Sequence, residues 1–253
     1  MNSTGCLKAS IRSAQLTRVN AFEDLARKTS TYIIPGADFV RRKDSVTVES
    51  VVIDPTGKEI GRQQKVHLFR REKEVAVPGR GYSVFDVEGV KIGIAICHDL
   101  VYPEVARILA LKGVEVIFVP ARIDVRGLAP WELYVRARAL ENRVPVVSAN
   151  FLKPSKYPGF SIIVRLRLSK EGGGIVYPEI TQKGGTRQTV LIADLDLEEI
   201  GPQKMERLRA RRPDTYSELL QPWNQCLLLT GRRRGLARPR LSWEPEEASC
   251  EEV

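Results

Sequence analysis

The amino-acid sequence predicts a mixed α/β domain built around parallel strands that are buried on both faces. Strand and helix patterns alternate between residues 90 and 150, and the strands at 90–97 and 114–120 are apolar almost throughout. Hairpin patterns lie before and after this alternating stretch. The combination is typical of one large α/β domain, and 253 residues are enough for its core.

Before residue 90 the sequence predicts a helix, a short strand and a hairpin. Apolar residues at helical spacing lead into residues 22–27. Residues 31–36 have the pattern of a short buried strand. Two segments, 46–53 and 59–66, flank the turn Asp54-Pro55-Thr56-Gly57 and are expected to pair as a hairpin.

After residue 97 the alternation continues. The sequence predicts a helix over residues 103–112, because Pro103 suits the first turn of a helix and Gly113 suits the position just after its end. A second helix and a strand are expected at 131–142 and 144–150. Two further strands, at residues 161–166 and 175–177, flank a glycine-rich turn. A last strand is expected at residues 189–196, followed by a final helix that ends at about residue 210.

The chain is strongly basic, with a formal net charge of +9 and a pI of about 9.5. Such a balance can reflect contact with nucleic acid or with an anionic surface. Here the positive charge gathers in residues 207–212 and 232–240, and arginine runs of this kind favour solvated charge near a chain end. We therefore expect no nucleic-acid partner, and a nucleic-acid-associated protein is the third of three hypotheses.

The number and spacing of cysteines and histidines indicate a protein with reduced thiols and no zinc-binding motif. The spacing of the four cysteines fits neither a disulfide framework nor a zinc motif, and only two histidines occur. The chain has no run of about 18 apolar residues, and its start lacks the apolar block of a signal peptide. These features predict a cytoplasmic protein that does not contact a membrane.

Cys97 is the candidate nucleophile because it ends the apolar strand at 90–97. Open α/β folds place their chemistry at the carboxyl edge of such strands. Lys65 also follows a strand, and it would stabilise a thiolate and an oxyanion if the two strands are neighbours. The backbone amide of His98 is a second candidate oxyanion donor. Judged without the surrounding sequence, Cys97 fits a small buried core residue better than a nucleophile. Lys65 on the same basis better fits a surface lysine at the end of a strand.

Other sequence blocks accompany those around Lys65 and Cys97 in a definite order. They are residues 22–27, 32–36, 52–61, 65–69, 78–79, 93–104, 131–143, 150, 159–161, 193–196 and 212–214. In order and spacing these blocks resemble the carbon–nitrogen hydrolase (nitrilase) superfamily, and the resemblance covers about residues 20–220.

The resemblance implies a four-layer α-β-β-α sandwich of nitrilase type that forms homo-oligomers and uses no cofactor. It also implies that Cys97 attacks a small amide, nitrile or N-carbamoyl compound and forms a thioester, while Lys65 stabilises the tetrahedral species. Glu72 fits the position of a supporting carboxylate, although it is also one charge in the charged run at 70–74. Glu104 and Glu141 match glutamates that serve as structural ion-pair partners.

One part of the family pattern is missing. The family's general base is a glutamate at the end of an early strand, whereas residues 1–20 contain no Pro-Glu and no apolar strand. We therefore predict an N-terminally shortened fold: an atypical segment at 1–20, a hydrolase domain at 21–220 and a largely disordered basic and acidic tail at 221–253. The alternative function is an inactive homologue that oligomerises or binds a ligand without turnover.

The choice of substrate is expected to depend on two loops, residues 122–130 and 151–158. Arg122, Arg126 and Arg136 in and near the first loop would suit a substrate that carries a carboxylate. They would equally form salt bridges within the protein, and we favour that interpretation from the sequence alone.

Overall fold

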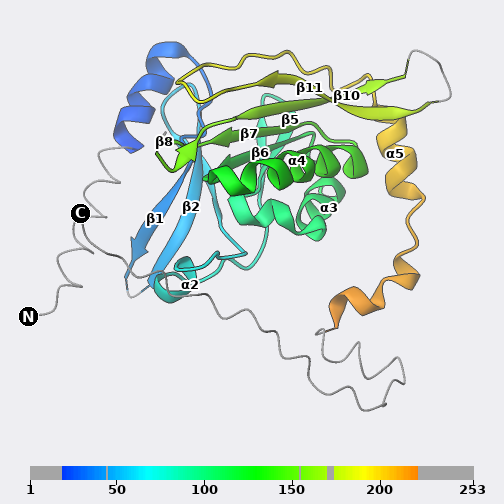
Figure 1. Cartoon of the computed structure of the whole chain (residues 1–253), viewed down its shortest axis with the longest axis horizontal. Helices are drawn as coiled ribbons and strands as arrows, with labels where there is room; N and C mark the ends of the chain where they lie inside the picture. Colours follow the sequence, from blue (N-terminus) through cyan, green and yellow to red (C-terminus); the bar gives the residue numbers. More distant parts are fainter. Residues whose placement is uncertain (1–18, 44, 154, 170–173, 222–253) are drawn as a thin grey trace, which may run out of the picture. The chain divides into compact units, whose positions relative to one another are not determined.

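Two β-sheets form the framework of the protein in its computed structural model, which describes residues 19–43, 45–153, 155–169 and 174–221 (Figure 1). An antiparallel sheet has the order β1-β2-β3, and a mixed sheet has the order β11-β10-β7-β6-β5-β4. The strands of the first sheet are β1 (Ala37–Arg42), β2 (Ser45–Ile53) and β3 (Glu59–Gln64). Those of the second are β4 (Val84–Val87), β5 (Val90–Ile94), β6 (Val116–Ala121), β7 (Val146–Asn150), β10 (Ile162–Leu168) and β11 (Val176–Lys183).

The centre of the mixed sheet is parallel, as the apolar strands predicted. β5 pairs with β6 in parallel, and β6 pairs with β7 in the same way. The crossover helices α3 (Pro103–Leu111) and α4 (Leu128–Asn142) lie side by side along one face of these strands (Figure 1). A residue with positive φ follows each helix: Gly113 two positions after α3, near where the sequence indicated, and Arg143 directly after α4.

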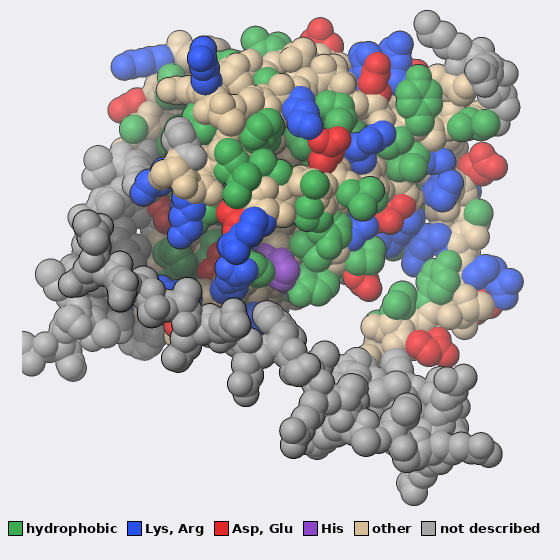
Figure 2. Space-filling model, in the orientation of Figure 1, with side chains coloured by type: hydrophobic (Ala, Val, Ile, Leu, Met, Phe, Trp, Pro, Cys, Tyr) green, Lys and Arg blue, Asp and Glu red, His purple; other side chains and the backbone are tan. Residues whose placement is uncertain are grey.

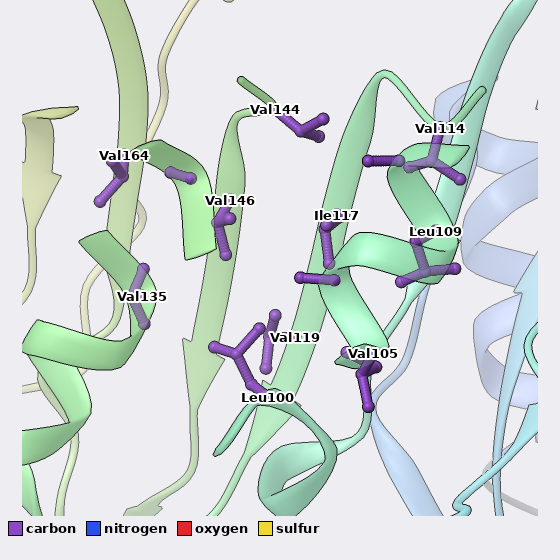
Figure 3. Close-up of a cluster of buried hydrophobic side chains, with 14 of the residues drawn as sticks. Leu100, Val105, Leu109, Val114, Ile117, Val119, Val135, Val144, Val146 and Val164 are labelled. Carbon is purple, nitrogen blue, oxygen red and sulfur yellow. The ribbon is translucent and has the colours of Figure 1, made fainter. Parts of the chain in front are cut away.

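The largest core lies between these helices and the mixed sheet. Figure 3 shows the branched aliphatic side chains that fill it, including Leu100, Leu109, Ile117, Val135 and Val146. Most of these side chains are fully buried, so the helices are held by apolar packing along a continuous surface.

A second core joins the two sheets to each other. Val48 and Val52 of β2 pack with Ile92 and Ile94 of β5 and with Val116 of β6. Because side chains alternate along a strand, Val51 and Ile53 face the opposite way, where they contact Ala26 of the helix at residues 19–29. The layers therefore run helix, sheet, sheet, helix, which is the order that the resemblance implied.

Shorter elements complete the described chain. They are α2 (Glu72–Val75), α5 (Gly201–Arg209), the hairpin β8 (Leu152–Lys153) with β9 (Tyr157–Pro158), and the 3-10 turns η1 (Cys97–Val101), η2 (Val125–Gly127), η3 (Pro213–Thr215) and η4 (Ser217–Leu220). The chain divides into two compact units at residues 210 and 211, and both sheets belong to the first unit. Among the described residues, every helix is too short or too polar to cross a membrane.

Some expectations about elements were wrong. Residues 189–196 form no strand, and residues 31–36 contribute only a single bridge between Ile33 and Ile53. The strand expected to reach Cys97 ends at Ile94. The predicted atypical segment at 1–20 and the tail at 221–253 lie almost entirely outside the described residues.

Candidate active site

Cys97 stands in an uncommon backbone conformation at the carboxyl end of β5. It opens the turn η1 with φ of +49°, in the left-handed region that favours glycine. A non-glycine residue persists there only when its surroundings hold it, and such residues concentrate at functional sites. Its side chain is a free thiol of intermediate exposure.

Lys65 follows β3, so it comes from the other sheet. The strands before Lys65 and Cys97 are therefore not neighbours in one sheet, and the two residues leave sheets that pack face to face. The Lys65 side chain is only 2% exposed. Its backbone is fixed at both ends: the amide donates to Val48 O and the carbonyl accepts from Gly79 N, each at 2.8 Å.

Glu72 compensates the buried charge of Lys65. It begins the short helix α2, and its Oε2 lies 2.5 Å from Lys65 Nζ. The same oxygen accepts a hydrogen bond from Phe69 N at 2.7 Å, which fixes its orientation. A buried ammonium needs such a partner, because an unpaired charge in the interior is costly. The structure thus brings together the lysine and the glutamate that the sequence selected.

Asp99 joins the loop after β3 to the turn at Cys97, a role that sequence analysis missed. Its carboxylate is fully buried and accepts hydrogen bonds from His67 N at 2.7 Å and from Ile96 N at 3.1 Å. The His67 ring nitrogen Nδ1 lies 3.0 Å from the same carboxylate. His67 and Ile96 flank Lys65 and Cys97 closely in the sequence, so one side chain sets the separation of the two candidate catalytic segments.

The Cys97 sulfur lies among opposing electrostatic influences. Burial raises the pKa of the thiol, and the carboxylate of Glu72 raises it further, while the backbone amides of Arg122 and His98 and the charge of Lys65 lower it. Burial dominates, so the pKa is above its ordinary value. Amides and an ammonium converging on one sulfur are the donors that a negatively charged oxygen on an attacked carbonyl would need.

Four rings near Cys97 and Lys65 contact one another. The rings of His67 and Tyr102 are stacked with centroids 3.9 Å apart, and His98 contacts both Phe69 and Tyr102. Burial and the nearby charge of Lys65 lower the pKa of His98, so its ring is neutral at pH 7. The charged pair of Lys65 and Glu72 thus has uncharged ring contacts close by in the chain.

Comparison with known proteins decides the family. The model of the family described as carbon-nitrogen hydrolase matches residues 5–205. The chain belongs to this family. An omega-amidase, NIT2 of Xenopus tropicalis, is 31% identical over 211 residues, which cover 76% of this chain and 72% of the relative. A nitrilase of Pyrococcus abyssi is 36% identical over 175 residues, covering 69% and 63%.

The fold agrees with the family. The crystal structure of a carbon-nitrogen hydrolase from Helicobacter pylori G27 superposes with a TM-score of 0.73 at 26% identity, covering 84% of this chain and 78% of that one. The protein therefore has the α/β fold of nitrilase type that the sequence predicted.

Two further glutamates of this carbon-nitrogen hydrolase, Glu104 and Glu141, were expected to form structural ion pairs. Glu141 pairs with Arg138 at 3.2 Å, and Arg138 donates to the carbonyls of Leu100 and Val101 at the end of η1. Glu141 is thus the structural ion-pair partner that we expected. Glu104 is exposed and forms no ion pair with another residue in the described part of the chain, so its role as an ion-pair partner stays a prediction.

The residues around Cys97 do not resemble a metal site. No group of three or more histidine, cysteine, aspartate or glutamate side chains is placed to hold a metal ion in the described ranges.

Proposed function

We propose that this carbon-nitrogen hydrolase cleaves small amides through a thioester on Cys97. The convergence of Lys65, Glu72 and the amides of Arg122 and His98 around one thiol carries the proposal. The names of the relatives, an omega-amidase and a nitrilase, support an amide or a nitrile as the substrate class.

In the proposed first step the thiol loses its proton as the sulfur attacks the amide carbon. A C–S bond forms and the carbonyl oxygen becomes an oxyanion, which Lys65 and the backbone amides stabilise. The proton then passes to the amide nitrogen, the C–N bond breaks and ammonia leaves. Water attacks the resulting thioester, and the C–S bond breaks to release the acid and restore the thiol.

The proton needs an acceptor because burial keeps the pKa of Cys97 above its ordinary value. Glu72 is a carboxylate whose charge reaches the sulfur, so we propose that it takes the proton, directly or through water. Its hydrogen bond with Lys65 also keeps the ammonium in place.

Ammonia release from a panel of small amides tests the proposal. Cys97→Ala should abolish turnover, and Glu72→Gln should reduce kcat about 10²- to 10⁴-fold, the usual value of a general base. Glu74→Gln is the matched control, because Glu74 lies on the same short helix but is exposed. It should retain turnover.

Two outcomes would contradict the proposal. Turnover that survives Cys97→Ala would remove the sulfur from the reaction. A chain that binds amides and hydrolyses none would favour the alternative, an inactive homologue that acts by binding or association.

A further inference from the structure

The two loops that we expected to determine the substrate meet beside Cys97. Residues 122 and 151 follow β6 and β7, which pair so that Ala121 lies opposite Asn150. Phe151 N donates to Ala121 O at 2.8 Å, so the chains leave the two strands at the same level. Since the amide of Arg122 also acts on the Cys97 sulfur, both loops begin at the candidate nucleophile.

The Arg122 side chain extends from this point over two aromatic rings. Its guanidinium carbon lies 4.9 Å from the centre of the Phe151 ring and 5.6 Å from the centre of the Tyr157 ring. Phe151 and Tyr157 contact each other edge to face at 5.8 Å. Stacking occupies a face of the planar guanidinium and leaves the N–H groups along its edges directed elsewhere.

Arg122 differs in this respect from the arginine four residues along the same loop. Arg126 pairs with Asp124 at 3.4 Å. Arg122 is exposed and has no ion pair with a carboxylate in the part of the chain that the structure describes. Our preference for salt-bridged arginines thus applies to Arg126 but not to Arg122.

We propose that Arg122 is a specificity-determining residue that binds a carboxylate on the acyl part of the substrate. This inference rests on the proposed amide hydrolysis at Cys97. A stacked guanidinium presents two parallel N–H donors, which match the two oxygens of a carboxylate. The preferred substrates are then monoamides of short dicarboxylic acids, whose amide reaches Cys97 while the far carboxylate reaches Arg122.

Succinamate and butyramide form a matched pair for the test, because a carboxylate in one replaces a methyl group in the other. The unmodified chain should have the higher kcat/KM for succinamate. Arg122→Gln should lower the ratio of the two kcat/KM values at least about 10-fold, the value of a charge-assisted bidentate contact. Arg126→Gln, which removes the same charge from the same loop, should leave the ratio within about twofold.

A ratio that is unchanged in Arg122→Gln, or that falls equally in Arg126→Gln, would overturn the inference. If the unmodified chain hydrolyses neither amide, the proposed function fails and Cys97 alkylation decides instead. Fumaramate and fumaramide are anionic and neutral thiol-reactive amides of the same size. Their relative rates at Cys97, mapped by mass spectrometry, should shift against fumaramate by a similar factor in Arg122→Gln. An unchanged relative rate would reject the role of Arg122 independently of turnover.

Discussion

At the scale of single residues, Asp99 shows how one buried carboxylate can organise a site without touching the reacting atoms. It accepts from the backbone of His67 on one side and of Ile96 on the other. Each of these residues lies within two positions of a candidate catalytic residue. Asp99 is therefore a positioning residue, and it holds Cys97 in its left-handed conformation relative to Lys65.

Asp99→Asn should lower kcat for amide hydrolysis about 10-fold or more while changing KM little. The amide that replaces one carboxylate oxygen presents N–H donors to a backbone donor, so one of the two backbone contacts is lost. The rate of Cys97 alkylation should change in the same variant, because the sulfur moves relative to Lys65.

Asp86→Asn is the matched control, since Asp86 accepts from Gly89 N in the exposed turn between β4 and β5. It should leave kcat and alkylation unchanged. An Asp99→Asn enzyme with full kcat would show that the hydrogen bonds of Asp99 do not set the geometry of the site.

The sequence could predict some of these residues and not others. Cys97 was visible because an apolar strand ends near it, and Lys65 because a strand precedes it. Asp99 carries no local signal, because its partner His67 lies 32 positions away in the chain. Arg122 was visible as a loop arginine, but its contact with Phe151, 29 positions away, was not. Contacts of that kind depend on how the two sheets and their loops are stacked.

At the scale of elements, periodicity predicted the centre of the fold and failed at its margins. Residues 191–200 alternate regularly between half-buried and exposed positions, yet residues 189–196 form no strand. A strand needs a hydrogen-bonded neighbour, which alternation alone does not provide. The opposite error occurs at β1, whose polar sequence gave no signal but which pairs with β2 along its whole length.

Glu49 joins the three strands of the smaller sheet. It lies on β2 with a fully buried side chain and pairs with Arg42 of β1 at 3.0 Å and with Arg62 of β3 at 2.6 Å. Burial by itself would raise its pKa, but hydrogen bonds from Arg42, Thr47 and Arg62 outweigh burial and lower the pKa to about 2.

Glu49→Gln should therefore reduce the free energy of unfolding at pH 7 by about 3 kcal/mol. Because the folded pKa of Glu49 is depressed, its contribution is complete above the unfolded pKa of 4.5 and declines as the pH falls towards 2. The difference in unfolding free energy between the variant and the unmodified protein should narrow by about 1.4 kcal/mol between pH 7 and pH 3.5, measured by urea unfolding.

Glu179→Gln provides the comparison for an exposed pair. Glu179 pairs with Arg165 at 2.6 Å, but its side chain is 38% exposed, so its loss should cost less than about 1 kcal/mol. Equal costs for the two substitutions, or a Glu49→Gln effect that does not change with pH, would show that the buried network does not hold the sheet.

At the scale of the whole molecule, the positive charge does not form one continuous surface on the face that Figure 2 shows. Lysine and arginine side chains there are separated by acidic and hydrophobic ones. Lysine and arginine side chains that are dispersed in this way are typical of a solvated surface, whereas binding to the phosphates of a nucleic acid needs a continuous positive surface. The absence of a nucleic-acid partner stays a prediction.

Association of the chain with copies of itself is the remaining prediction at this scale. The helices α3 and α4 cover the mixed sheet, and each leaves large apolar side chains exposed. Ile108 and Leu111 of α3 are 38% and 47% exposed, and Leu133 of α4 is 69% exposed. Apolar groups that gather on neighbouring helices are typical of an interface between proteins.

We expect sedimentation velocity to show a dimer or a larger assembly of the full chain. Leu133→Glu should shift the distribution towards monomer, because a charge buried in the interface has no partner there. Its thermal unfolding should stay close to that of an equally diluted unmodified protein, since Leu133 does not contribute to the described core. Ile175→Glu is the control, because Ile175 is 64% exposed but lies in the hairpin between β10 and β11. A monomeric unmodified chain, or dissociation by Ile175→Glu and not by Leu133→Glu, would show that α3 and α4 do not form the interface.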